Sequence, residues 1–139
     1  MSQSDRDQLL SILELKKEWL TKMREMTEQC KTLLENDDVD AFSKALEARE
    51  GIIGKIDAFS KTEKQYTDAD DAQILVLKQE IRGIILEIIK LDEKNEALAQ
   101  HKIELYRADL KNLNEKKKGI GMYTNAYKKN DAFYFDEKK

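Results

Sequence analysis

This chain of 139 residues contains no proline. Inside a helix, proline removes a backbone hydrogen bond, clashes with the preceding turn and costs about 3 kcal/mol. Its absence, together with only five glycines, predicts long uninterrupted helices. Charged residues make up 38% of the chain and hydrophobic residues 40%, which is typical of helices that bury one stripe and solvate the rest. We therefore expect an all-α fold, and the length favours one domain.

The first expected helix spans about residues 5–35, with Ser4 as its N-cap and an end near Asn36. Its apolar residues recur in steps of three and four, as they do in a coiled coil. The expected buried stripe is Leu9, Ile12, Trp19, Met23, Met26, Cys30 and Leu33, with Lys16 at one position of the stripe and Leu13, Leu20 and Leu34 beside it.

The second expected helix spans about residues 38–61 and follows a short turn at residues 36–38, which offers a ready N-cap. So short a linker requires the first two helices to form an antiparallel hairpin. Gly51 and Gly54 interrupt this helix, and we interpret them as positions of close helix packing. The apolar stripe of the second helix is Val39, Phe42, Leu46, Ile53 and Ile56, with Ile52 and Phe59 beside it.

The third expected helix spans about residues 69–117 and is capped by Asp68 or Asp70. At about 1.5 Å per residue it would be ~70 Å long, so it must extend past the hairpin or break. Its apolar stripe shifts phase near Asn95, as at the stutter of a coiled coil. Residues 1–118 are thus expected to form an antiparallel three-helix bundle, in which a helical hairpin packs with a long third helix.

An isoleucine-rich stretch of the third helix is apolar over more than a narrow seam. One interpretation places it at the centre of the core, and the other leaves part of this face exposed for a partner helix. The stretch consists of Ile84, Ile85, Ile88 and Ile89.

Residues 119–139 form a C-terminal tail that is both aromatic and basic. The last seventeen residues hold five of the ten aromatic residues, and residues 111–139 carry eight lysines against four acidic residues, a net charge of +4. The other 110 residues then carry −7, because the whole chain carries −3. Polar disordered segments have few aromatic residues. These aromatic side chains therefore either fold over the open end of the bundle or bind a partner.

Catalytic and metal-binding patterns are missing from the sequence. His101 is the single histidine and falls on a polar helical face, so we expect it to be solvated. Cys30 falls on the apolar stripe, where a free cysteine behaves as a small hydrophobic residue. There is no glycine-rich phosphate loop and no zinc-ligand spacing. We therefore expect no enzyme, no catalytic residues, no cofactor and no metal.

Charge and hydropathy also narrow the classes of partner and the location. The acidic body would repel the phosphates of nucleic acids, and no apolar run approaches the ~20 residues that span a bilayer. The N-terminal residues MSQSDRDQ do not resemble a secretory signal, and one cysteine allows no internal disulfide. We expect a cytoplasmic protein that neither binds nucleic acid nor inserts into a membrane.

Binding to another protein is the remaining function. Helix-in-groove recognition uses apolar anchors at helical spacing, which Ile120, Tyr123 and Tyr127 have. The alternatives are a structural coiled coil that self-associates through the third helix, giving a homo-oligomer, and a helical adaptor. The expected protein-binding residues are Leu110, Leu113, Ile120, Tyr123, Tyr127, Phe133, Tyr134 and Phe135.

Two stretches resemble a known family. The hairpin sequence LLENDDVDAFSKALEAREGIIGKI carries an acidic turn and a Leu-x-x-Arg-Glu pattern at Leu46, Arg49 and Glu50. The stretch IIKLDEKNEAL is followed by lysines, a tyrosine and the terminal FYFDEKK. Over most of its length the chain resembles the flagellar export chaperones of the FliT and FlgN type.

The resemblance implies a small cytoplasmic chaperone that binds the C-terminal helices of a late flagellar subunit. It would prevent premature assembly of that subunit and deliver it to the type III export gate. The clients are the filament cap protein for FliT and the hook–filament junction proteins for FlgN; LDEKN at 91–95 favours the cap protein. The family's C-terminal binding region would fall on residues 110–127. We also expect residues 119–139 to compete with the client for its binding site.

Overall fold

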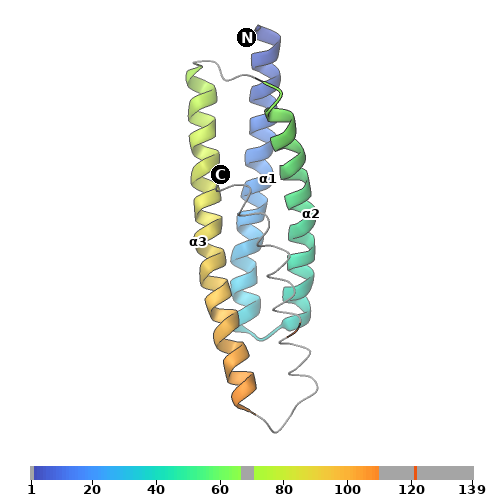
Figure 1. The fold of residues 1–139 in the computed structure, drawn as a ribbon, viewed down its shortest axis with the longest axis vertical. Coiled ribbons are helices and arrows are strands. Elements are labelled where there is room, and N and C mark those ends of the chain that lie inside the picture. The colour runs from blue at the N-terminus through green and yellow to red at the C-terminus, as the bar shows by residue number, and fades with distance from the viewer. Residues whose placement is uncertain (1, 67–70, 110–120, 122–139) are drawn as a thin grey trace.

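The computed structural model describes residues 2–66, 71–109 and 121 of the chain. These residues form three helices, α1 (Gln3–Glu35), α2 (Val39–Glu63) and α3 (Ala72–Ala108), and no strand. Consecutive helices run in opposite directions along one long axis (Figure 1). The predicted all-α fold and the three-helix bundle are confirmed for this part of the chain. The predicted tail, residues 119–139, lies outside the described residues apart from Gly121.

The α1–α2 hairpin turns where the sequence predicted. Asn36 ends α1, Asp37 has a left-handed backbone with φ of 56°, and the Asp38 side chain caps α2 by accepting from the Ala41 amide at 3.2 Å. An aspartate tolerates the left-handed conformation better than most residues. The hairpin is therefore specified locally by three consecutive turn-forming residues.

Two predicted N-caps are wrong. Helix α1 begins two residues earlier than expected, because the Ser2 hydroxyl accepts from the Asp5 amide and places Ser4 inside the first turn. Helix α3 is capped by Asp71, whose carboxylate accepts from the backbone amides of the next turn and also binds Arg6 of α1. That tertiary contact favours Asp71 over the two aspartates before it.

Helix α3 is continuous through the predicted phase shift. Its buried residues step by four twice in succession both before Asn95, from Ile84 to Ile88 to Asp92, and after it, from Asn95 to Ala99 to Ile103. The described helix ends at Ala108, and Figure 1 shows it extending past the α1–α2 turn. The predicted continuation to residue 117 lies outside the described residues.

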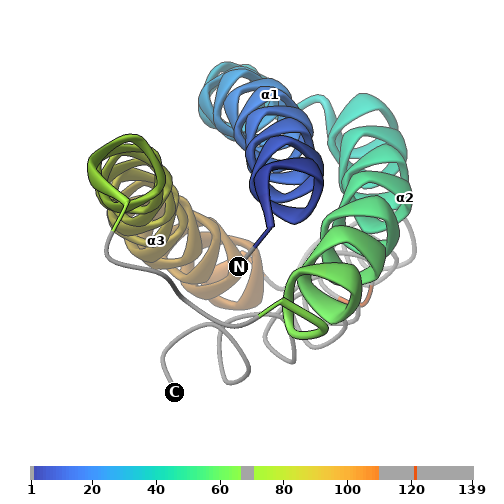
Figure 2. The same cartoon turned by 90° about the horizontal axis from the view of Figure 1, so that it is seen from above.

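Helix α1 is the central element of the bundle. It packs against both neighbours, whereas no Cα atom of α2 lies within 8 Å of a Cα atom of α3 over their described lengths. Figure 2 shows α2 and α3 on either side of α1. Ion pairs Lys17–Glu80 and Arg24–Glu87 join α1 to α3 along one edge. The bundle therefore has two close helix–helix interfaces instead of three.

The buried stripe of α1 is centred differently from the prediction. Leu13, Leu20 and Leu34 are fully buried, whereas Ile12 and Trp19 are half-buried at its edges. This follows because α1 has a helix on each side, so the middle of its buried face points between them. Lys16 is buried within the stripe as predicted, and its ammonium group donates to Glu63 of α2 at 3.4 Å.

The apolar core divides into two clusters along the bundle axis. The N-terminal cluster, near the start of α1, contains Leu9, Leu13, Leu20, Met23, Ile56, Ile74, Ile81, Ile84 and Ile88. The turn cluster, near the α1–α2 turn, contains Cys30, Leu34, Phe42, Leu46, Ala99 and Ile103.

The predicted close packing at the two α2 glycines is wrong. A Cβ atom built on Gly51 or Gly54 would meet no other atom within 4 Å. Both residues lie on the exposed side of α2, which no other described helix covers.

In the isoleucine-rich stretch of α3, Ile84 and Ile88 are buried in the core while Ile85 and Ile89 are half-buried. None of the described helices is both long and apolar enough to span a membrane.

Candidate functional site

Large apolar residues are exposed mainly on α3. Leu75, Val76, Leu86 and Leu105 are each 51–54% exposed, and Leu15 of α1 is 40% exposed. Exposed apolar residues scattered singly are ordinary on soluble proteins. Here, four of the five that the described residues contain belong to one helix. Helix α3 is therefore the best candidate for contact with a partner.

Three of these exposed residues, Leu75, Val76 and Leu86, lie in one region of the α3 surface. Leu75 and Leu86 are eleven residues apart, which is three helical turns, so they lie on the same side of the helix. Gly83 lies between Val76 and Leu86, and a Cβ atom there would meet nothing within 4 Å. We call Leu75, Val76, Gly83 and Leu86 the α3 outer face. Its bare glycine backbone allows a partner helix to approach closely.

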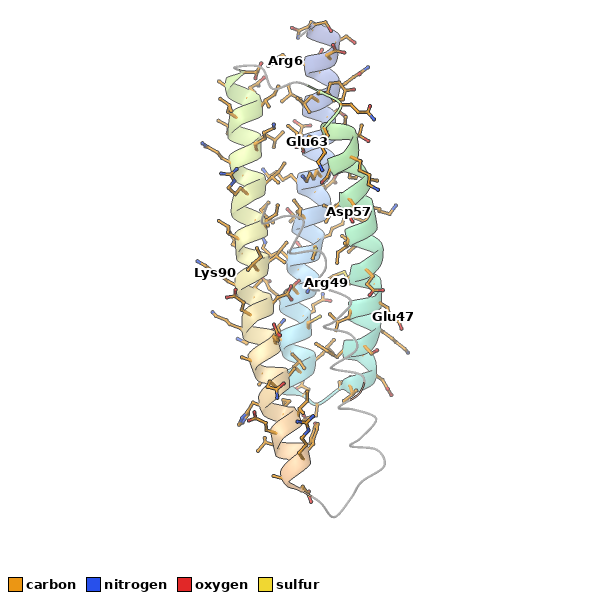
Figure 3. The ribbon with its side chains drawn as sticks, in the orientation of Figure 1. Arg6, Glu47, Arg49, Asp57, Glu63 and Lys90 are labelled. Atoms are coloured by element: carbon orange, nitrogen blue, oxygen red, sulfur yellow. The ribbon has the colours of Figure 1, made fainter. Side chains whose placement is uncertain are left out.

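Charged residues border the α3 outer face. Lys90 points away from the bundle, as Figure 3 shows, and Arg82 is also exposed. On the edge toward α1, Glu80 and Glu87 are held by Lys17 and Arg24. An amphipathic helix with acidic residues beside its apolar stripe would complement Arg82 and Lys90.

A surface groove of about 680 Å³ runs between α1 and α3 on the same edge. Four glutamates, two lysines, a threonine and Leu77 line it, so it is more polar than the α3 outer face. The described residues contain no cluster of three or more side chains suited to a metal ion. The groove is lined by Glu14, Lys17, Glu18, Thr21, Lys22, Glu25, Leu77 and Glu80.

Between the two apolar clusters, a buried ion pair joins α2 to α3. The Arg49 guanidinium donates to both carboxylate oxygens of Asp92, at 2.5 and 2.6 Å. Arg49 is 0% exposed and Asp92 is 6% exposed, and Figure 3 shows Arg49 between α2 and α3. Arg49 belongs to the Leu-x-x-Arg-Glu pattern and Asp92 to the LDEKN stretch at 91–95.

Two more buried polar residues lie beside this pair. The Asn95 amide nitrogen donates to the Thr27 carbonyl at 3.0 Å, and the Thr27 hydroxyl donates to the Met23 carbonyl at 2.7 Å. The Asn95 side-chain oxygen is buried and accepts no hydrogen bond from the described residues. We call Thr27, Arg49, Asp92 and Asn95 the polar layer.

Cys30 lies close to the polar layer. Burial raises the pKa of its thiol to about 11, while the nearby Arg49 charge opposes this rise and the Asp92 charge adds to it. The thiol is therefore protonated at neutral pH and is a poor nucleophile. Cys30 is buried, as its position on the apolar stripe predicted.

Polar clusters close both ends of the bundle. At the turn, the Asp37 carboxylate accepts from the Lys102 ammonium and the Tyr106 hydroxyl, both at 2.8 Å. These hydrogen bonds, that of Lys102 first, lower the pKa of Asp37. At the other end, the hydrogen bond from Arg6 and those from backbone amides lower the pKa of Asp71. Each cluster connects α3 to another part of the bundle.

The predicted binding residues lie outside the part of the chain that the structure describes, so their contacts are not placed. These residues are Leu110, Leu113, Ile120, Tyr123, Tyr127, Phe133, Tyr134 and Phe135.

The sequence reasoning missed both the α3 outer face and the polar layer. The signal for the α3 outer face was available, because Leu75, Val76 and Leu86 do not belong to the apolar stripe that includes Ile74, Ile81, Ile84 and Ile88. The signal for the second was the arginine that interrupts the apolar stripe of α2. His101 is exposed, as predicted.

Comparisons of this chain with family models, curated proteins and solved structures found no match.

Proposed function

We propose that this protein is a cytoplasmic chaperone, without catalytic activity, that binds an amphipathic helix of another protein. The observation that carries the proposal is the α3 outer face, where half-exposed leucine and valine side chains surround an open glycine. A client helix that covers this face would bury its own apolar stripe as well. Binding in this way masks a surface that would otherwise aggregate or assemble.

The client class follows from the family resemblance. The proposed clients are the C-terminal helices of a late flagellar subunit, with the filament cap protein favoured and the hook–filament junction proteins next. The chaperone would keep that subunit unassembled and deliver it to the type III export gate. Release at the gate requires reversible binding, which favours a few anchor residues over a large obligate interface.

Two segments of the chain are proposed to contact the client. One is the α3 outer face, and the other is the C-terminal region that holds Tyr123 and Tyr127. Leu105, which is 54% exposed near the end of α3, lies between them along the sequence.

The test is a quantitative binding assay with purified full-length protein and C-terminal helical fragments of the cap and junction proteins. We expect the double change Val76→Ala and Leu86→Ala to weaken binding about tenfold or more, because each interface anchor contributes more than about 1 kcal/mol. Leu15→Ala removes a similarly exposed leucine from α1 and is the matched control. Failure to bind any fragment would contradict the chaperone function.

A second double change, Tyr123→Ala with Tyr127→Ala, separates the two segments. Loss of binding in this variant, with full binding by the α3 variant, would place the site in the C-terminal region. Equal loss in both variants would support a client that spans α3 and the C-terminal region.

The tail is proposed to regulate the same site. Its aromatic side chains suit competition with a client for the exposed apolar residues of α3. Deleting residues 119–139 should then tighten client binding. Unchanged or weaker binding by the truncated protein would contradict autoinhibition.

Self-association through α3 is the second candidate function, because the same exposed apolar residues could pair with a second copy. Sedimentation velocity over a wide range of protein concentration distinguishes the two functions. A monomer at all concentrations would exclude self-association. A dimer that Leu86→Ala dissociates would favour it.

A further inference from the structure

Each helix contains a series of buried residues spaced seven apart. On α1, four residues spaced seven apart from Leu13 to Leu34 are all buried. Helices α2 and α3 each contain a similar series of buried residues spaced seven apart. One member of each series is polar and the others are apolar. The series are Leu13, Leu20, Thr27 and Leu34 on α1; Phe42, Arg49 and Ile56 on α2; and Ile74, Ile81, Ile88 and Asn95 on α3.

The three polar members meet at one level of the bundle. Asn95 donates to the backbone of Thr27, and Arg49 is paired with Asp92, one turn from Asn95. Each of the three helices therefore contributes a polar residue at the same position of its repeat. Apolar layers lie on both sides of this level.

The apolar layers by themselves specify the alignment of α3 poorly. Ile74, Ile81 and Ile88 are identical residues at seven-residue intervals and are all buried. Moving α3 by seven residues, which is about 10 Å along its axis, would replace one isoleucine with another in much of the N-terminal cluster. Such a shift would keep most of the apolar burial.

The polar layer distinguishes these alignments. After a seven-residue shift, Arg49 would face Ile85 or Ala99 in place of Asp92, and its buried charge would lose its partner. A buried charge without a partner is strongly unfavourable, and a single buried asparagine at the equivalent position of a coiled coil is known to specify register. The ion pairs at the bundle ends, Arg6–Asp71 and Lys102–Asp37, are partly exposed to solvent and therefore oppose a shift less strongly than a fully buried pair.

We propose that Thr27, Arg49, Asp92 and Asn95 act as a register-specifying polar layer, which fixes the axial alignment of α3 against the α1–α2 hairpin. Fixing the axial alignment is most important for α2 and α3, because no Cα atom of one helix lies within 8 Å of a Cα atom of the other over their described lengths. The layer gives the bundle one arrangement among several that its apolar repeat allows. This inference is independent of the proposed function, and no client enters its test.

The test compares α3 alignment in the full-length chain with and without the layer. Nitroxide labels at Lys44 of α2 and Gln79 of α3, both exposed, report their separation by double electron–electron resonance, in a Cys30→Ala background and diluted with unlabelled protein. The apolar variant carries Arg49→Met, Asp92→Leu and Asn95→Ile. Without these changes, we expect a single distance between the two labels. In the apolar variant, we expect a second population of molecules in which this distance differs by several ångströms.

Two further variants make the result specific. Lys17→Met with Glu80→Leu removes an exposed ion pair between α1 and α3, whose side chains are 40% and 45% exposed, and should keep the single distance. The exchange Arg49→Asp with Asp92→Arg retains an ion pair at the polar layer and should also keep the single label–label distance. A folded apolar variant with the single original distance would overturn the proposal. Failure of the apolar variant to fold would also overturn it, because its apolar repeat would then be insufficient for a bundle.

Discussion

The N-terminal cluster and the polar layer beside it contribute differently to the fold. The cluster contains nine buried apolar residues, and its burial is favourable in any alignment that keeps apolar side chains together. The polar layer satisfies most of its hydrogen bonds in one alignment. The comparison indicates that apolar burial supplies most of the stability, while a few buried polar groups select one arrangement.

The largest expected effect comes from breaking the buried ion pair. Arg49→Met alone should lower the free energy of unfolding by about 3–5 kcal/mol, because the Asp92 carboxylate is left buried without its partner. Adding Asp92→Leu should recover this loss or exceed it, since apolar replacement of both partners is often neutral or stabilising. Urea denaturation monitored by circular dichroism measures both variants. If Arg49→Met alone were as stable as Arg49→Met with Asp92→Leu, the unpaired Asp92 carboxylate would not be the cause of the destabilisation.

The next effect tests the N-terminal cluster. Ile88 is fully buried, so Ile88→Ala should lower the free energy of unfolding by about 2–5 kcal/mol through lost burial and a cavity. Leu86→Ala, two residues away at a half-exposed position, is the control and should change stability by less than about 0.5 kcal/mol. Equal losses in the same denaturation assay would mean that Leu86 is also packed.

A smaller, favourable effect is expected outside both regions. Gly51→Ala should raise the free energy of unfolding by about 0.5–1 kcal/mol, because alanine favours the helix and its methyl group meets no neighbour. Gly83→Ala should stabilise α3 similarly. It also adds a methyl group to the α3 outer face, so it should weaken client binding while Gly51→Ala leaves it unchanged. A loss of stability at Gly51 would indicate a contact on that side of α2.

The smallest effect concerns the turn end of the bundle and depends on pH. Asp37→Asn keeps a residue that tolerates the left-handed backbone but removes the charge that Lys102 and Tyr106 stabilise. It should lower stability at neutral pH by up to about 1 kcal/mol, as for an exposed ion pair. Glu47→Gln, at an exposed position of α2, is the control.

The sign of the pH dependence follows from the lowered pKa of folded Asp37. The stabilisation is fully present above the unfolded pKa of about 3.9 and is lost as the pH falls through the folded value. Thermal midpoints of the original protein and Asp37→Asn should therefore differ at pH 7 and converge toward pH 2. A difference that persists at pH 2 would assign the effect to packing instead of charge.

Much of the fold was accessible from the sequence. The hairpin turn at residues 36–38 and the buried Lys16 depend on local spacing and on capping side chains. The N-caps at Ser2 and Asp71 were missed for different reasons. Ser2 and Ser4 offer equivalent local patterns, and Asp71 also binds Arg6 of another helix, a contact that local spacing does not reveal.

The candidate site was harder to predict. Apolar residues that leave the stripe of α3 are visible in the sequence, but their exposure depends on which side of α3 packs against α1. The predicted binding residues from Leu110 to Phe135 remain a prediction. The polar layer needed three separate observations to be combined, one from each helix.

The sequence by itself determined three helices, their order and a hairpin, because caps and hydrophobic periodicity act over a few residues. Only the tertiary structure decided that α1 is central, that α2 and α3 stay apart, and that Thr27, Arg49 and Asn95 meet at one level. Those features depend on how whole helices align. Hydrophobic repeats leave that alignment nearly degenerate, whereas the directional hydrogen bonds of buried polar groups do not.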